Sequence, residues 1–168
     1  LWADNDGETY LSFMTELESL CLVYVLDAFA KTGFTFQPEA VWSTRQIMQQ
    51  IGIIPSYQRL LTCLLTMLAD GGILQRIGDN WRVMHVPSAV DPLQQSAALQ
   101  DEYRYTHELL LLDRCGGKLS EVLRGAQDPL ELLFPNGDSS LVSQLYTTAP
   151  NTIVANGLVQ RIVKTIMT

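Results

Sequence analysis

Apolar residues recur at intervals of three and four over residues 10–31, with Leu17, Leu20 and Tyr24 among them, and polar residues fill the positions between. This spacing puts the apolar side chains on one side of a helix, where they can pack against a core. Gly33 follows at the position where a helix commonly ends. The pattern therefore predicts an amphipathic helix over residues 10–31.

Two further helices are predicted in the next forty residues. Ser43 and Gln46 have the spacing of a capping box, which predicts a helix running to Gln50. A leucine-rich run with helical spacing then predicts a third helix over residues 57–70, with Ser56 as its N-cap.

A β-hairpin is predicted after the third helix. The runs 73–77 and 81–86 are short and strand-like, and Gly78, Asp79 and Asn80 between them are typical turn residues. Three helices followed by a hairpin is the order of a winged helix-turn-helix. Residues 1–90 are therefore expected to form a winged-helix-like half with one short β-hairpin.

The second half, residues 91–168, is predicted to be helical. Asp91 and Pro92 are typical of an N-cap and first turn, and one long helix is expected from there to about Asp113. Glycines 116 and 117 interrupt it. Short helices are expected over 119–123, 128–134, 140–146 and 152–168, the last capped by Asn151. The fold class is mainly α.

The composition and net charge of the chain argue against some classes of function. The 168 residues carry a net charge of −7, with a pI near 4.7, and Arg59 is the only basic residue of the third helix. Nucleic-acid binding depends on Lys and Arg contacts to phosphate, so we expect no nucleic-acid partner. No apolar run is long enough to predict a membrane span. The charged share, 17%, is low and favours a piece whose surface is partly covered in a larger assembly.

Candidate chemistry is sparse. The two histidines, His85 and His107, fall in separate halves and do not form a metal site or catalytic dyad in the sequence pattern. We therefore predict no catalytic and no metal-binding residue. Three cysteines, an odd number spaced far apart, favour reduced thiols in a cytoplasmic protein, and Cys115 is expected to be a packing residue at a helix end.

One stretch resembles a known family. Residues 119–137 read LSEVLRGAQDPLELLFPNG, and Leu145-Tyr146 follows, with Pro150 and Asn156 behind. A Leu-Arg-Gly turn, a Asp-Pro-Leu-Glu-Leu-Leu-Phe-Pro run and a Leu-Tyr pair in this order resemble polyketide-synthase methyltransferases. The resemblance covers about a third of the chain.

The resemblance implies a role as well as a fold. In that family these motifs lie in a helical lid that precedes a Rossmann-like core, and the core transfers a methyl group from S-adenosylmethionine to the α-carbon of an acyl chain on an acyl carrier protein. The lid encloses the acyl chain and excludes water. The expected partners are the methyltransferase core, neighbouring synthase domains and the acyl carrier protein. The implied substrate-binding residues are Tyr146, Asn156 and Asn151.

Several interpretations stay open. Tyr146 is equally explained as a half-buried tyrosine that anchors the lid, and Asn151 as a helix cap. Tyr103, Arg104 and Tyr105 could contact a carrier protein, although a solvated helix face explains them as well. No glycine-rich strand-to-helix turn is present, so the fragment is expected to bind no cofactor and to be inactive alone. The alternatives are a structural adaptor of a megasynthase and the dimerisation region of a small-molecule O-methyltransferase.

Overall fold

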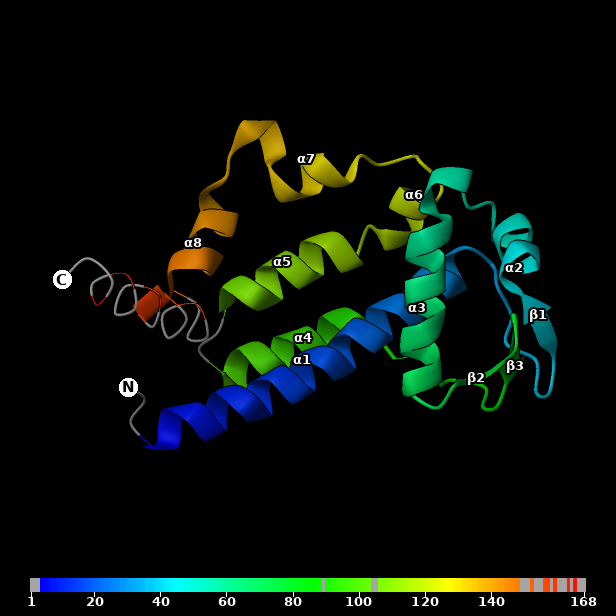
Figure 1. Ribbon diagram of the computed structural model, residues 1–168, viewed down its shortest axis with the longest axis horizontal. Helices are drawn as coiled ribbons and strands as arrows, with labels where there is room; N and C mark the ends of the chain where they lie inside the picture. Colours follow the sequence, from blue (N-terminus) through cyan, green and yellow to red (C-terminus); the bar gives the residue numbers. More distant parts are fainter. Residues whose placement is uncertain are drawn as a thin grey trace.

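The computed structural model describes residues 4–88, 90–103 and 106–148, together with residues 152, 156, 157, 159, 163 and 165. Over these residues the protein is mainly α-helical, as predicted, with eight α-helices and one three-stranded antiparallel sheet. The helix α1 (Asp4–Lys31) is the longest of them and extends from one end of the molecule to the sheet-containing half (Figure 1).

The winged half follows α1 directly. Its elements are β1 (Val41–Ser43), α2 (Thr44–Ile51), α3 (Gln58–Asp70), β2 (Leu74–Ile77) and β3 (Asn80–Val83). The predicted capping box is confirmed: the Ser43 hydroxyl accepts from the Gln46 backbone N–H, and the Gln46 side chain accepts from the Ser43 backbone N–H. Ser56, however, does not cap α3. A 3-10 turn over Pro55–Tyr57 leads into the helix and takes that position.

The sheet has the strand order β1-β3-β2, so the predicted hairpin is present and β1 is an additional, unpredicted strand. The second hairpin strand was expected to reach residue 86 but ends at Val83. The N–H of Met84 still bonds in register to the carbonyl of Ile73, but the N–H of Ile73 donates to Leu68 at the end of α3 and not back to β3, so the ladder ends there. Trp81 is buried beneath the sheet, and its indole N–H donates to the Thr44 hydroxyl at 2.9 Å.

A single apolar core holds the winged half together. Helices α1, α2 and α3 and one face of the sheet all contribute side chains to it. Only the C-terminal third of α1 contributes side chains to this core, so the rest of the helix is not needed to bury them. Its most buried members are Val25, Phe29, Ile47, Ile51, Leu61, Leu65, Leu68, Val83 and Leu123.

The helical half contains α4 (Pro92–Glu102), α5 (Thr106–Gly116), α6 (Leu119–Leu123), α7 (Pro129–Leu133) and α8 (Ser140–Thr148). The prediction of one long helix from Asp91 to Asp113 is wrong: α4 ends before Tyr103, whose backbone is extended. The Tyr103 ring packs against that of Phe13 on α1, with centroids 5.4 Å apart. The remaining bounds agree with the predicted short helices, and Asp91 is the N-cap of α4 as expected.

A second core lies between α1, α4 and α5. It contains Tyr10, Phe13, Leu20 and Tyr24 from α1 together with Leu99 of α4 and Leu109 of α5. Since α1 enters both cores, it is the element that the two halves share. The division into residues 1–90 and 91–168 stays a prediction.

The C-terminal segment is described at six positions, and these are helical, in keeping with the predicted last helix. Asn151, its predicted cap, lies outside the described residues. Among the described helices, none combines the length and apolar character that crossing a membrane requires.

Candidate functional site

The Leu-Arg-Gly turn of the resembling stretch is a junction between helices. Arg124 donates from Nε to the carbonyl oxygen of Ile51 at 3.0 Å and from Nη2 to that of Thr32 at 2.9 Å. These carbonyls lie at the C-terminal ends of α2 and α1, where backbone acceptors lack partners within the helix and a cation is favourable. Leu123 accepts from the N–H of Ile54 at 3.1 Å. The turn therefore ties α6 to the C-terminal ends of α1 and α2.

Gly125 completes this turn with a backbone geometry that favours glycine. Its φ is +72°, and a Cβ atom at this position would lie 3.0 Å from Cδ1 of Ile54. A larger residue would be strained in φ and crowded by Ile54.

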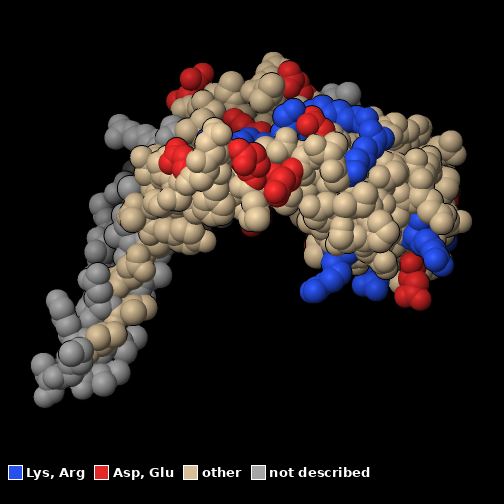
Figure 2. Space-filling model, turned by 90° about the horizontal axis from the view of Figure 1, so that it is seen from above, with Lys and Arg blue, Asp and Glu red and all other residues tan. Residues whose placement is uncertain are grey.

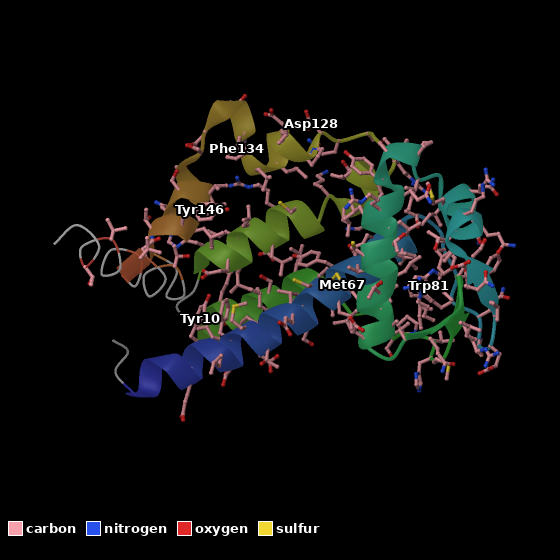
Figure 3. All side chains as sticks on the ribbon, in the orientation of Figure 1. Tyr10, Met67, Trp81, Asp128, Phe134 and Tyr146 are labelled. Carbon is pink, nitrogen blue, oxygen red and sulfur yellow. The ribbon has the colours of Figure 1, made fainter. Side chains whose placement is uncertain are left out.

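The Asp-Pro run that follows builds α7. Asp128 caps the helix by accepting from the N–H of Leu130 at 2.8 Å, and Pro129 occupies the first turn. Arg114 of α5 contacts the carbonyl of Leu132 at 3.4 Å, which holds α7 beside α5. The motif residues labelled Asp128 and Phe134 in Figure 3 thus flank α7, the helix that precedes α8.

Asp138 sets the start of α8. Its carboxylate accepts from the backbone N–H of Ser140 at 2.8 Å and from the Ser140 hydroxyl at 2.9 Å. These two bonds, with a smaller contribution from the Arg114 charge, lower the pKa of Asp138. The carboxylate therefore stays ionised and fixes the first turn of the helix on which the predicted site tyrosine lies.

Tyr146 lies on α8 and is exposed, with 66% of its surface accessible. Leu141 on the same helix is buried, so α8 packs through one side and presents Tyr146 on another. Within the described residues Tyr146 is therefore not half-buried, and its roles as a lid anchor and as a substrate contact both stay predictions. Asn156 is also exposed, and no hydrogen bond joins it to Tyr146. Asn151 lies outside the described residues, so the assignment of Tyr146, Asn156 and Asn151 to one substrate site stays a prediction.

A buried polar network lies where α1, α4 and α5 meet. Asp113 of α5 accepts from the Tyr24 hydroxyl at 2.8 Å and from the Ser96 hydroxyl at 2.8 Å. Burial, reinforced by the bond to Asp113, raises the pKa of Tyr24. Sequence reasoning missed this network. The sequence feature that could have pointed to it is Asp113, a single carboxylate that follows the apolar run Leu109–Leu112 and stands three residues before Gly116.

The remaining reactive side chains are dispersed. His85 lies beyond β3, exposed, with Nδ1 2.9 Å from the carbonyl oxygen of Gly72. His107 lies on α5 and does not pair with Asp113, whose oxygens are held by Tyr24 and Ser96. Within the described part of the chain, no cluster of three His, Cys, Asp or Glu side chains is placed to hold a metal ion.

Cys115 is half-buried, which agrees with the predicted packing cysteine. Burial raises the pKa of its thiol, and the neighbouring Arg114 charge only partly offsets that effect. A thiol with a raised pKa is a poor nucleophile at neutral pH.

A cavity of about 280 Å³ lies between α1 and the segment 86–90. Its walls are mainly apolar, with Phe34 and Phe36 among them, and Asp27 is its charged residue. That carboxylate forms an ion pair with Lys31 at 2.6 Å. Neither Tyr146 nor Asn156 lines this cavity.

The described residues do not fit S-adenosylmethionine. A Rossmann-like site needs a parallel strand joined by a glycine-rich turn to a helix. The one sheet in the described part of the chain is antiparallel, and its β1 strand enters α2 directly through the cap Ser43. No residue of this part is therefore assigned to the cofactor.

Relatives exist at the level of sequence. No protein-family model matches the chain. The chain is 29% identical over 134 residues to non-reducing polyketide synthase prhL of Penicillium brasilianum and 30% identical over 135 residues to nvfA of Aspergillus novofumigatus. These alignments cover 78% and 79% of the chain but only 5% and 6% of the two synthases.

Comparison with solved structures identifies the family more narrowly. The CurJ carbon methyltransferase matches 96% of this chain and 43% of its own, with a TM-score of 0.89 and 34% identity. The chain is related to the polyketide-synthase carbon methyltransferases. The DszA carbon methyltransferase shares the fold at a TM-score of 0.80 and 24% identity, over 92% of this chain and 40% of that one. More than half of each solved methyltransferase therefore lies outside the matched region.

Proposed function

We propose that this chain is the lid of a carbon methyltransferase in a polyketide synthase. The observation that carries the proposal is the 0.89 TM-score to the CurJ carbon methyltransferase, over nearly all of this chain and less than half of that one. The lid acts with a separate core that binds S-adenosylmethionine, and it encloses an acyl chain delivered on an acyl carrier protein in the cytoplasm. By itself it is not catalytic.

The chemistry of methyl transfer explains why a lid is useful. Transfer to a carbon atom requires a developing enolate, which water would protonate. A helical cover that excludes water and holds the acyl chain near the methyl donor favours the transfer over protonation.

Tyr146 is the lid residue that we assign to the acyl substrate. Its exposure on α8 leaves both the hydroxyl and the ring free for a contact outside the described residues. A tyrosine can donate a hydrogen bond to a substrate carbonyl while its ring contacts the acyl chain. The positions of Asp128 and Asp138, which cap α7 and α8, support this role because they fix the helix that carries it.

The test uses the intact methyltransferase region, with transfer of a labelled methyl group from S-adenosylmethionine to a β-ketoacyl chain on the carrier protein. Wild-type protein is expected to label the chain. The Tyr146→Phe variant is expected to lose about tenfold or more in kcat, the usual scale for a hydrogen bond made in the transition state. Tyr57→Phe, the same substitution in the winged half, is the matched control and should leave the rate unchanged.

Two results would count against the proposal. Absence of any methyl transfer by the intact region would remove the methyltransferase role. An unchanged rate in Tyr146→Phe, with the control also unchanged, would remove the assigned contact and leave only an enclosing role for the lid.

A further inference from the structure

The sheet of the winged half has one face that nothing in the described structure covers. Successive residues of a strand point to opposite faces, so burial of Trp81 and Val83 in the core puts Arg82 on the outer face. Directly opposite Arg82 in the register stand Val41 of β1 and Gln75 of β2. Arg82 therefore lies on the central strand, between a neighbour on each side.

Exposed apolar side chains surround this arginine. Val41, Ile77 and Met84 are 49%, 38% and 40% exposed, and all three share the outer face by strand alternation. Apolar groups around a partly buried cation are typical of the centre of a protein interface, where Arg is enriched. We name Val41, Gln75, Ile77, Arg82 and Met84 the outer sheet surface.

The segment that contains the sheet differs in the sign of its charge from the whole chain. Residues 40–88 contain four arginines and two aspartates, a net +2, whereas the chain as a whole is −7. Figure 2 shows most of the visible blue side chains over the winged half and most of the red ones elsewhere. A locally positive segment on an acidic protein favours contact with an acidic partner at that segment.

The arginines near the sheet have no acidic partner of their own. The two ion pairs recorded among the described residues are Lys31–Asp27 and Lys118–Glu121. Arg76 instead donates to the carbonyl of Gly78 and lies 5.7 Å from the ring centre of Trp81. The guanidinium groups are therefore available to carboxylates from another protein.

We propose that the outer sheet surface docks the carrier domain that brings the acyl substrate. The partner fits by chemistry: a protein surface with carboxylates around an apolar centre pairs with Arg82 and covers Val41, Ile77 and Met84. The proposal rests on the proposed function, because it assumes that the substrate is delivered on a carrier. It places delivery on the winged half, and not on the Tyr103–Tyr105 segment, of which residues 104 and 105 lie outside the described structure.

An acidic protein is favoured over nucleic acid as the partner. The helix α3, which would enter a DNA groove in a winged-helix protein, carries Arg59 as its only basic residue. The remaining side chains of the outer sheet surface are apolar or neutral, and such groups gain little from a phosphate backbone.

The experiment compares two substrates of the intact methyltransferase region. One is the β-ketoacyl chain on the synthase's own carrier domain, and the other is the same acyl group on a small soluble thioester. Arg82→Glu is expected to lower kcat/KM for the carrier-bound substrate about tenfold, mainly through KM, because a charge reversal replaces attraction by repulsion. The small thioester needs no docking surface and should be methylated within about twofold of the wild-type rate.

Two further variants sharpen the comparison. Arg59→Glu makes the same charge change on α3, away from the sheet, and should affect neither substrate by more than about twofold. Arg82→Lys keeps the charge and should recover most of the carrier-bound activity, which a role in folding alone would not predict. Circular dichroism of each variant establishes that the fold is retained.

The outcomes separate the two proposals. If wild-type protein methylates neither substrate, the proposed function fails. If the small thioester is methylated but Arg82→Glu leaves the carrier-bound rate unchanged, docking at this face is refuted. Equal losses on both substrates would mean that the face packs on the rest of the enzyme and would also refute docking. Salt-sensitive binding of duplex DNA that Arg82→Glu abolishes would overturn the choice of an acidic protein partner.

Discussion

Replacement of Gly116 by alanine should loosen the helical half. Gly116 ends α5 and lies against the ring of Tyr24 on α1. A Cβ atom at this position would be 2.5 Å from Cγ, 2.7 Å from Cδ1 and 2.9 Å from Cδ2 of that ring. Carbon atoms pack comfortably at about 3.5–4.0 Å, so either α5 or the tyrosine must move by about 1 Å.

The expected cost has two parts. Forcing an extra methyl group into a packed interface costs about 1–3 kcal/mol. Movement of the Tyr24 ring also weakens the 2.8 Å bond from its hydroxyl to Asp113, and a hydrogen bond to a charged group contributes about 1.5–3 kcal/mol. Alanine recovers up to about 1 kcal/mol of helix propensity. A net loss of about 2–4 kcal/mol in the free energy of unfolding follows.

Urea unfolding followed by far-ultraviolet circular dichroism measures this loss. Gly157→Ala is the matched control, since it lies at a helical position and its Cβ atom would meet no described atom within 4 Å. That variant should be neutral or slightly more stable. Trp42 and Trp81 both belong to the core of the winged half, so tryptophan fluorescence in a Trp2→Phe background reports whether that half unfolds together with the destabilised one.

A double variant tests the stated cause. Tyr24→Leu removes the ring that Gly116 approaches, so adding Gly116→Ala to it should cost much less than adding Gly116→Ala to the wild type. If Gly116→Ala alone stays within about 0.5 kcal/mol of the wild type, the helices adjust without loss and the reasoning is refuted.

Three further substitutions have defined outcomes. Arg124→Met removes the side-chain donor of two helix-end carbonyls and should lower the free energy of unfolding in urea by about 2–3 kcal/mol, with a change in tryptophan fluorescence because the winged half is involved. An unchanged unfolding midpoint would contradict a stabilising role for these two hydrogen bonds. Ser43→Ala removes a capping box and should cost about 1 kcal/mol in the same assay, whereas no loss would mean that Gln46 caps alone. Glu108 has a pKa raised mainly by burial, and its Oε1 lacks a partner among the described residues, so its folded-state pKa exceeds its unfolded one. The protonated Glu108 carboxyl therefore contributes to stability at a pH below its pKa in the unfolded chain. This contribution is lost as the pH rises through its pKa in the folded protein. Glu108→Gln should therefore stabilise the protein by less than about 1 kcal/mol at pH 7, with a gain that disappears near pH 4, and an equal gain at both values would contradict the assignment to ionisation.

Local signals predicted local structure well. The capping box at Ser43, the Asp91 cap and the glycine turn of the hairpin each act within a few residues, and the structure has all three. The break after α4 was not predicted; Tyr103, where α4 ends, packs against Phe13, and the sequence pattern does not show a contact ninety residues away in the chain. Tertiary contact overrides helical periodicity at such a position.

Long-range polar contacts were also beyond the sequence pattern. Arg124 reaches carbonyls 73 and 92 residues earlier, and the sequence contains no sign of either partner. Asp113 reads as an ordinary helix-surface carboxylate until α1 and α4 bring Tyr24 and Ser96 to it. For the candidate site, the sequence located Tyr146 on a helix, but its exposure depends on how α8 packs.

The residues that identify the family are therefore mainly structural. Arg124 and Gly125 join α6 to the winged half, and Asp128 and Asp138 cap the two helices that follow. None of these four acts on a substrate in the described structure, yet together they determine where α8 presents Tyr146. A substitution in this motif is expected to displace the helix that carries Tyr146, even though the motif itself contacts no substrate in the described structure. Contacts to the acyl substrate are therefore expected from the exposed side chains that this scaffold positions, and not from the motif residues themselves.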